Sequence, residues 1–271
     1  MVTDPSRKAK AFQHQWANRS ARRLAAAAAA GFDFPTTRVG VTPDNLMTVY
    51  YDPSLGQPGT DLGQQVLAQG PQVYGDCQAF FGVAGQPVNV IIAALNNLTD
   101  GSAGAYHYGC SFNPGGDLYC DAAFGNPQME IGLVVAELTE SFMGAQGKGW
   151  DCGGSNGEAL SRVLAELLSG GPDGSLAGYS TGPAWDQSGQ PNWIDATEST
   201  DQDSVSTGCG VVYLYWMLSK GFTPAQVTQA GCPDGTLASN YFALTNTATA
   251  WDDFSAAVAA LPGGVFSDNP W

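Results

Sequence analysis

Residues 134–140 read Val-Val-Ala-Glu-Leu-Thr-Glu, and residues 156–161 read Asn-Gly-Glu-Ala-Leu-Ser. The first stretch lies within a helix that we predict over residues 127–143, because apolar side chains recur there at spacings of three and four. At about 100° per residue, the opposite side of that helix carries the acids Glu130, Glu137 and Glu140. Periodicity alone favours a solvated acidic face.

A second helix is predicted from about Asn156 to Gly170, where Gly-Gly-Pro ends the apolar pattern. Ser155 to Glu158 form a capping-box pattern, in which Glu158 reaches back to the backbone N–H of the cap residue. Glu158 therefore has two open interpretations. It is a helix cap, or it belongs to a site shared with the preceding helix.

The paired stretches resemble the catalytic region of the gluzincins, thermolysin-like metallopeptidases with His-Glu-Leu-Thr-His on one helix and Asn-Glu-Ala-x-Ser on the next. The resemblance covers about 30 residues. Matched position by position, Glu137 corresponds to the general base, Glu140 to the second zinc-binding histidine and Glu158 to the ligand glutamate. Ala136 stands where the first histidine would be. The resemblance implies an α+β, zincin-like fold, in which a twisted mixed sheet packs on this helix and a mostly helical C-terminal lobe follows.

The chain has two histidines, His14 and His107, so one protomer cannot assemble a His-His-Glu zinc site. We therefore expect a zinc-less, non-proteolytic relative that binds a peptide-like or glycan ligand in a carboxylate-lined cleft, without a cofactor. A rival interpretation is an active, metal-independent hydrolase that uses Glu137, Glu140 and Glu158 for acid–base chemistry. A third is an acidic adhesive or structural module, in which the three glutamates are exposed and uncoupled.

Further candidate residues line the expected cleft. The zincin order of elements implies that Tyr106, His107 and Tyr108 lie beside it. The connection over residues 171–207 is too long to be an idle link, so we expect it to form a wall or lid. Its tryptophans, Trp185 and Trp193, would offer exposed platforms for sugars. Four acids in it could supply oxygen ligands to calcium: Asp195, Glu198, Asp201 and Asp203.

The six cysteines allow up to three disulfides and show no Cys-x-x-Cys spacing. Cys110 and Cys120 are the preferred pair, because they flank the turn sequence Asn113-Pro114-Gly115-Gly116 between two predicted strands. The even number of cysteines and the scarcity of lysine favour an extracellular or cell-envelope location, although buried free thiols are also common.

Charge divides the chain into a basic arm over residues 1–37 and a zincin-like domain over 38–271. Residues 1–38 carry seven Lys or Arg and two Asp (+5), and the remainder carries three basic and 23 acidic residues (−20), which sum to −15. An N-terminal helix or flexible arm fits the alanine-rich residues 25–30 better than an export signal does. The acidic body disfavours nucleic acid and anionic membranes as partners. No run of apolar residues is long enough for a membrane span.

The domain divides into a sheet-and-helix lobe over residues 38–146 and a helical lobe over 147–271. Strands are predicted at residues 38–42, 46–51 and 87–95, followed by a hairpin of 105–110 and 118–122, and a short helix at 60–69. Further helices are predicted at 209–219, after the Thr223 cap, at 237–244 and at 251–261.

Overall fold

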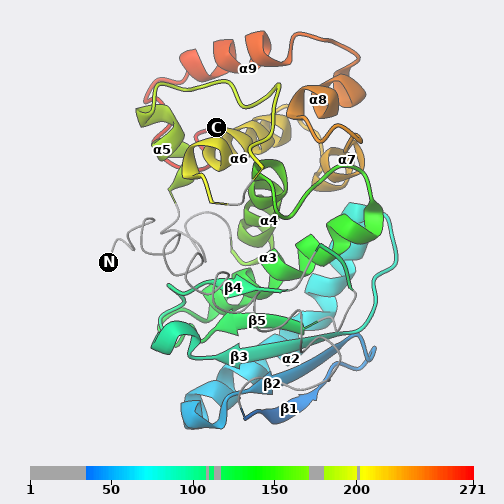
Figure 1. The fold of residues 1–271 in the computed structure, drawn as a ribbon, viewed down its shortest axis with the longest axis vertical. Helices are drawn as coiled ribbons and strands as arrows, with labels where there is room; N and C mark the ends of the chain where they lie inside the picture. Colours follow the sequence, from blue (N-terminus) through cyan, green and yellow to red (C-terminus); the bar gives the residue numbers. More distant parts are fainter. Residues whose placement is uncertain (1–34, 108–109, 113–116, 171–179, 200–201) are drawn as a thin grey trace.

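The computed structural model describes residues 35–107, 110–112, 117–170, 180–199 and 202–271. Across these residues the chain forms a mixed α/β fold with a five-stranded mixed sheet and eight α-helices. The sheet lies at one end of the molecule and the C-terminal helices lie at the other (Figure 1). The expected succession of a sheet and a helical C-terminal half is therefore confirmed. Residues 1–34 of the predicted basic arm lie outside the described residues.

The sheet has the strand order β1-β2-β3-β5-β4. Its members are β1 (Thr37–Val41), β2 (Met47–Tyr51), β3 (Val88–Ala93), β4 (Ala105–Tyr106) and β5 (Asp117–Asp121). The central strands β2, β3 and β5 run parallel, and the edge strands β1 and β4 pair antiparallel to their neighbours. All five predicted strands are present. The short edge strand β4 ends next to His107, which fixes where that side chain enters the protein.

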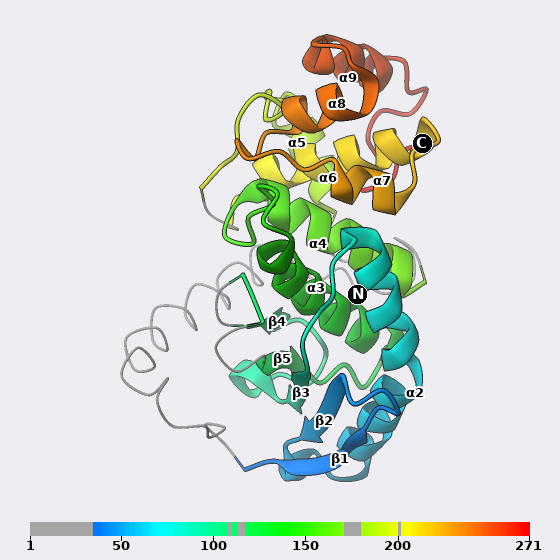
Figure 2. The ribbon, with the colours of Figure 1, turned by 90° about the vertical axis from the view of Figure 1, so that its right-hand side faces the viewer.

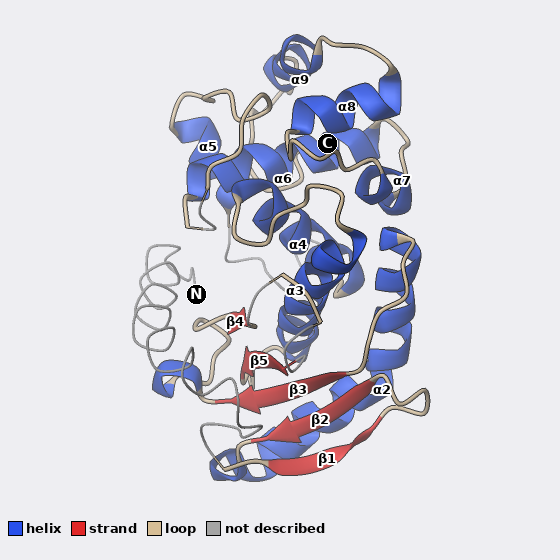
Figure 3. Ribbon diagram, turned by 45° about the vertical axis from the view of Figure 1, so that its right-hand side comes forward, coloured by secondary structure: helices blue, strands red, loops and turns tan. Residues whose placement is uncertain are grey.

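Two long helices cover one face of the sheet, α2 (Gly56–Phe81) and α3 (Pro127–Gln146) (Figure 3). The predicted helix at 127–143 is confirmed as α3. The predicted helix at 60–69 is much longer than expected, because α2 continues through Pro71 and ends at Gly82 in a left-handed conformation. Proline removes one backbone donor, but the buried face of α2, which includes Val66, Val73 and Phe81, holds the helix to the core.

The helical half follows directly from α3. Its helices are α4 (Ser155–Leu168), α5 (Thr181–Gln187), α6 (Ser204–Ser219), α7 (Pro224–Gln229), α8 (Leu237–Thr245) and α9 (Ala250–Ala259). α3 packs on α4 and α4 packs on α6, so these three helices connect the sheet to the C-terminal helices (Figure 2). The capping box at Thr223 is confirmed. The predicted capping box at Ser155 is wrong, because Gly154 is the N-cap of α4 and makes no side-chain cap bond.

The predicted Cys110–Cys120 disulfide is also wrong. Cys110 is bonded to Cys152, in the loop between α3 and α4, with their Cα atoms 5.5 Å apart. The antiparallel register of β4 and β5 pairs Cys120 with Ala105 instead, and the Cys120 side chain is fully buried in the core. Burial raises the pKa of the Cys120 thiol well above its usual value.

The three basic residues of the acidic body all have contacts in the folded chain. Arg162 pairs with Glu158, one turn earlier in α4, at 2.6 Å. Lys148 donates to the carbonyl oxygen of Gln229 at 2.7 Å, and the Lys220 ammonium lies 4.8 Å from the centre of the Trp216 ring. Among the described residues, none of the helices combines the length and the apolar character that crossing a lipid bilayer requires.

Candidate acid–base site

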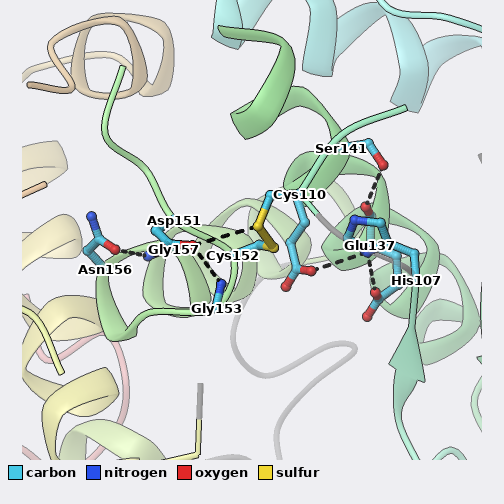
Figure 4. The surroundings of a disulfide bond; sticks show 10 residues. His107, Cys110, Glu137, Ser141, Asp151, Cys152, Gly153, Asn156 and Gly157 are labelled. Atoms are coloured by element: carbon cyan, nitrogen blue, oxygen red, sulfur yellow. Dashed lines mark hydrogen bonds and ion pairs between the residues drawn. A yellow bond between two sulfur atoms is a disulfide. The ribbon is translucent and has the colours of Figure 1, made fainter. Parts of the chain in front are cut away.

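Glu137 and Glu140 lie almost one turn apart on α3, on the side of the helix that meets β4. His107, which follows β4 directly, contacts both of them. Its Nδ1 is 3.0 Å from Glu137 Oε2 and 3.3 Å from Glu140 Oε2. Figure 4 shows the His107 ring and the Glu137 carboxylate facing each other beside the Cys110–Cys152 disulfide. The structure therefore gathers three of the predicted site residues, which we call the His–Glu–Glu cluster.

The cluster is buried, and the acidic face of α3 is not solvated. The side chains of His107, Glu137 and Glu140 are 4%, 6% and 13% exposed. The expectation of a solvated face is wrong because β4, His107 and residues 110–112 pack against α3. Glu130, about two turns before Glu137 on α3, is also buried and accepts a hydrogen bond from the Ala123 N–H at 3.1 Å.

Burial and charge act in opposition on the cluster. Burial by itself lowers the pKa of His107, but hydrogen bonds to Glu137 and Glu140, together with their charges, outweigh it and raise that pKa to about 10. Burial, with the charge of Glu137, raises the pKa of Glu140 to about 8, although His107 opposes this shift. At neutral pH these two shifts favour the protonated ring of His107 and the protonated carboxyl group of Glu140.

The second ring nitrogen of His107 is buried without a hydrogen-bond partner among the described residues. The contacts of Nδ1 with the two carboxyl groups fix the orientation of the ring. Nε2 takes no part in these contacts. Buried polar atoms are nearly always paired, so an unpaired one suggests a ligand or a catalytic role. A histidine held by a carboxylate at one nitrogen and free at the other is a common arrangement in acid–base sites.

Glu158 does not join the cluster directly. Its carboxylate is engaged by Arg162, and its charge adds only a minor upward contribution to the pKa of Glu140. The predicted convergence of three glutamates is thus observed for Glu137 and Glu140, whereas Glu158 lies near them and is neutralised by its own helix.

The residues do not fit a gluzincin-type zinc site. Ala136 and Glu140 replace the two histidines, and Arg162 occupies the ligand glutamate. Two groups of three potential metal ligands occur among the described residues, with all ligand atoms of each group within 4.8 Å. They are His107, Glu140 and Cys152, and Cys110, Asp151 and Cys152. Glu158 belongs to neither group, so the third ligand expected from the resemblance is not in place.

The predicted ligand-binding residues have different surroundings. Tyr106 is buried and stacks on Tyr119, with ring centres 4.8 Å apart, and Tyr108 lies outside the described residues. Trp185 is not an exposed platform, because it is fully buried, stacks on Phe254 and donates its indole N–H to the Pro191 carbonyl. Trp193 is half-buried and packs against the core.

The acids suggested for calcium do not form a group of ligands among the described residues. Asp203 accepts from the Val205 N–H as the N-cap of α6, and Asp195 accepts from the side chain of Asn192 at 2.6 Å. The Glu198 backbone exchanges hydrogen bonds with Ser155. Asp201 lies outside the described residues, so calcium here stays a prediction.

Sequence reasoning missed Cys152 and Arg162 as neighbours of the site. The spacing of Glu158 and Arg162, four residues apart on one helix, is a signal of an ion pair that was available in the sequence. The nearness of Cys152 to His107 had no such signal, because it depends on how the loop before α4 is placed in the folded chain. Comparison with known proteins adds no relative: no family model, no curated protein and no solved structure matches the chain.

Proposed function

We propose that the chain is a zincin-like protein without the zincin metal site, and that its His–Glu–Glu cluster is the acid–base centre of a metal-independent hydrolase. The observation that carries this proposal is the pairing of the His107 Nδ1 with two buried carboxyl groups while Nε2 has no described partner. Strongly shifted pKa values that arise from burial and specific charge partners gather at functional sites. The edge strand β4, followed along the chain by α3 and α4, supports the zincin-like interpretation of the fold.

The charge states assign different roles to the three residues. Glu137, as a carboxylate, takes a proton from a water molecule while the water oxygen attacks the electrophilic carbon of the substrate. The His107 imidazolium gives its Nε2 proton to the leaving group as the bond to that group breaks. Glu140, protonated at neutral pH, keeps a second negative charge away from Glu137. Exchange with water afterwards returns the proton of Glu137 to solvent and a proton to His107.

The substrate class follows from the charge of the body. Residues 39–271 carry three basic and 23 acidic residues, so an anionic substrate would be repelled and a neutral or cationic one accepted. A peptide-like or glycan ligand meets this condition. Among the described residues β4 is an edge strand of the sheet, so an extended peptide that pairs with it would have its backbone next to His107.

Glu137→Gln tests the proposal, because it removes the charge of the base with little change of shape. We expect hydrolysis of a peptide or glycan panel, measured with a chelator present, to fall at least about 100-fold. Ligand affinity should be retained. The matched control is Asp252→Asn, which removes one exposed charge on α9 and should leave turnover unchanged. Turnover that survives in Glu137→Gln, or that the chelator abolishes in the unaltered chain, would contradict the proposal.

A second candidate function is ligand binding without catalysis. The engagement of Glu158 by Arg162 favours it, because a residue expected at the site is already neutralised. This candidate predicts that the unaltered chain binds peptide or glycan but never converts it, and that Glu137→Gln changes affinity without any turnover to lose.

A further inference from the structure

The loop before α4 places a sulfur ligand, Cys152, next to the His–Glu–Glu cluster. Ligand atoms of His107, Glu140 and Cys152 all lie within 4.8 Å of one another, and so do those of Cys110, Asp151 and Cys152. The two groups share Cys152, whose partner in the disulfide is Cys110. We infer that opening this disulfide creates a site for a thiophilic divalent cation, such as Zn²⁺, held by Cys110, Cys152, His107 and Glu140.

An independent feature also indicates a ligand here. The His107 side chain is 4% exposed, and its Nε2 has no hydrogen-bond partner among the described residues. Glu137 holds the ring through Nδ1 at 3.0 Å. Metal-binding histidines commonly donate their other ring N–H to a carboxylate, which orients the ring and increases its basicity. Glu137 can fill this supporting role without being a ligand itself.

The donor set matches zinc better than calcium. Two thiolates, one imidazole and one carboxylate give the nitrogen and sulfur ligands that zinc prefers, whereas calcium binds oxygen ligands. At metal distances of about 2.0–2.3 Å, tetrahedral ligand atoms lie roughly 3.3–3.8 Å apart. Within each group the ligand atoms therefore need to approach one another by up to about 1.5 Å, and the two sulfur atoms need to separate once their bond is gone.

The disulfide is open to small reductants, because Cys110 and Cys152 are each only half-buried. A phosphine reductant attacks one sulfur, and with one water molecule it yields two thiols and the phosphine oxide. Binding of Zn²⁺ then releases both thiol protons, the Nε2 proton of His107 and the carboxyl proton of Glu140 to solvent. Asp151 Oδ1, 3.6 Å from the Cys110 sulfur, is an additional oxygen at the rim of the site. A disulfide sulfur has no hydrogen to donate, so this contact becomes a hydrogen bond only in the reduced form.

Cobalt and zinc titrations of the full chain test the inference. Protein reduced by a phosphine and then freed of it anaerobically should bind one equivalent of Co²⁺ with a thiolate-to-cobalt charge-transfer band, which Zn²⁺ abolishes. Zn²⁺ should bind the reduced chain at least about 100-fold more tightly than the oxidised chain, since even the outer-shell partners of a metal are worth 10–100-fold. The inference is overturned if the reduced, folded chain shows no such band, or if both forms bind equally.

Two variants assign the ligands. The double variant Cys110→Ser and Cys152→Ser should lose the charge-transfer band, whereas Cys232→Ser, which removes a free thiol elsewhere, should keep it. His107→Gln should keep the band but weaken Zn²⁺ binding at least about 10-fold. Circular dichroism checks that each variant is folded. A band that persists in the double variant would place the cation on other thiols and refute the site. These readouts involve no substrate, so they stand or fall separately from the proposed hydrolase activity.

Discussion

At the scale of single residues, the most consequential contact is the one between His107 and two acids of the same helix. Two carboxylates and one imidazolium together leave one uncompensated negative charge, and burying such a charge costs free energy. Protonation of Glu140 removes it. The raised pKa of His107 has a definite sign: its contribution to stability is complete below the ordinary value of 6.5 and is lost as pH rises through about 10.

This arrangement predicts an unusual titration for His107. With two histidines in the chain, replacing His14 by alanine leaves a single imidazole signal to follow by NMR. We expect that signal to titrate near pH 10 in the otherwise unaltered chain. In Glu137→Gln it should move down toward 6.5, because one of the two carboxylate partners is gone. A midpoint near 6.5 before any substitution would show that the carboxylates do not hold the ring.

The site was partly predictable from sequence. The spacing of Glu137 and Glu140 placed both acids on one helical face, and the resemblance to the zincin order of elements implied that His107 lies beside the cleft. The burial of that face was not predictable, because it depends on β4 lying across α3. Trp185 was mistaken for an exposed platform since nothing in its neighbourhood revealed α5, the short helix that buries it against Phe254.

At the scale of elements, most residues of α3 are buried, and the glycine near its end shows how closely the neighbouring chain packs against the helix. A Cβ added at Gly144, near the end of α3, would lie 1.4 Å from the Cys110 carbonyl oxygen. The last turn of α3 is therefore pressed against the segment that carries the disulfide. Gly75, in the exposed part of α2, has no neighbour within 4 Å of the same added atom.

These two helical glycines form a matched pair. Gly75→Ala should raise the free energy of unfolding by about 0.5–1 kcal/mol, because alanine favours the helix and meets no obstacle. Gly144→Ala should lower it by roughly 1–3 kcal/mol through overpacking. Urea unfolding of both variants provides the measurement. Equal effects at the two positions would mean that the end of α3 is not in contact with residue 110.

Glu130, on the first turn of α3, makes the free energy of unfolding depend on pH. Burial raises the pKa of Glu130 to about 8, a shift that the Ala123 hydrogen bond opposes and the charge of Asp121 increases. Its folded-state pKa lies above the ordinary value of 4.5, so its stabilising contribution is complete below 4.5 and lost as pH rises through 8. The slope from this group alone approaches 1.4 kcal/mol per pH unit.

Glu130→Gln should therefore flatten the decline of stability between pH 5 and pH 8. The amide oxygen can still accept from the Ala123 N–H, and the neutral side chain has no ionised form to bury. Unfolding free energies at the two pH values are the measurement, with Asp252→Asn as the exposed control. An unchanged slope would show that Glu130 ionises within the folded protein at no cost.

The elements themselves followed from the sequence where a local pattern was sufficient. The five strands and α3 were found from alternation, apolar spacing and turn residues. α2 was predicted too short, over 60–69 only, although the buried face of the helix continues on both sides of Pro71. Residues 155–158 match the sequence pattern of a capping box. In the structure, however, Glu158 accepts a hydrogen bond from Arg162, and the N-cap of α4 is Gly154.

At the scale of the whole molecule, α3, α4 and α6 connect the sheet to the C-terminal helices, and the His–Glu–Glu cluster and the disulfide lie where this connection begins. The sheet and the C-terminal helices form the two ends of the ribbon in Figure 1. The Cys110–Cys152 disulfide ties the loop between α3 and α4 to residue 110, so opening it removes a covalent link at the start of this connection.

The contacts of Lys148, Arg162 and Lys220 have a consequence for how the protein responds to its solvent. Among the described residues these three cations make one ion pair, one hydrogen bond to a carbonyl and one contact with an aromatic ring, and the carboxylates that repel one another far outnumber them. Mutual repulsion of this kind extends over about 30 Å at 0.01 M ionic strength but only about 8 Å at 0.15 M. The melting temperature should therefore climb by several degrees as sodium chloride is added, and a fall would mean that local ion pairing outweighs repulsion.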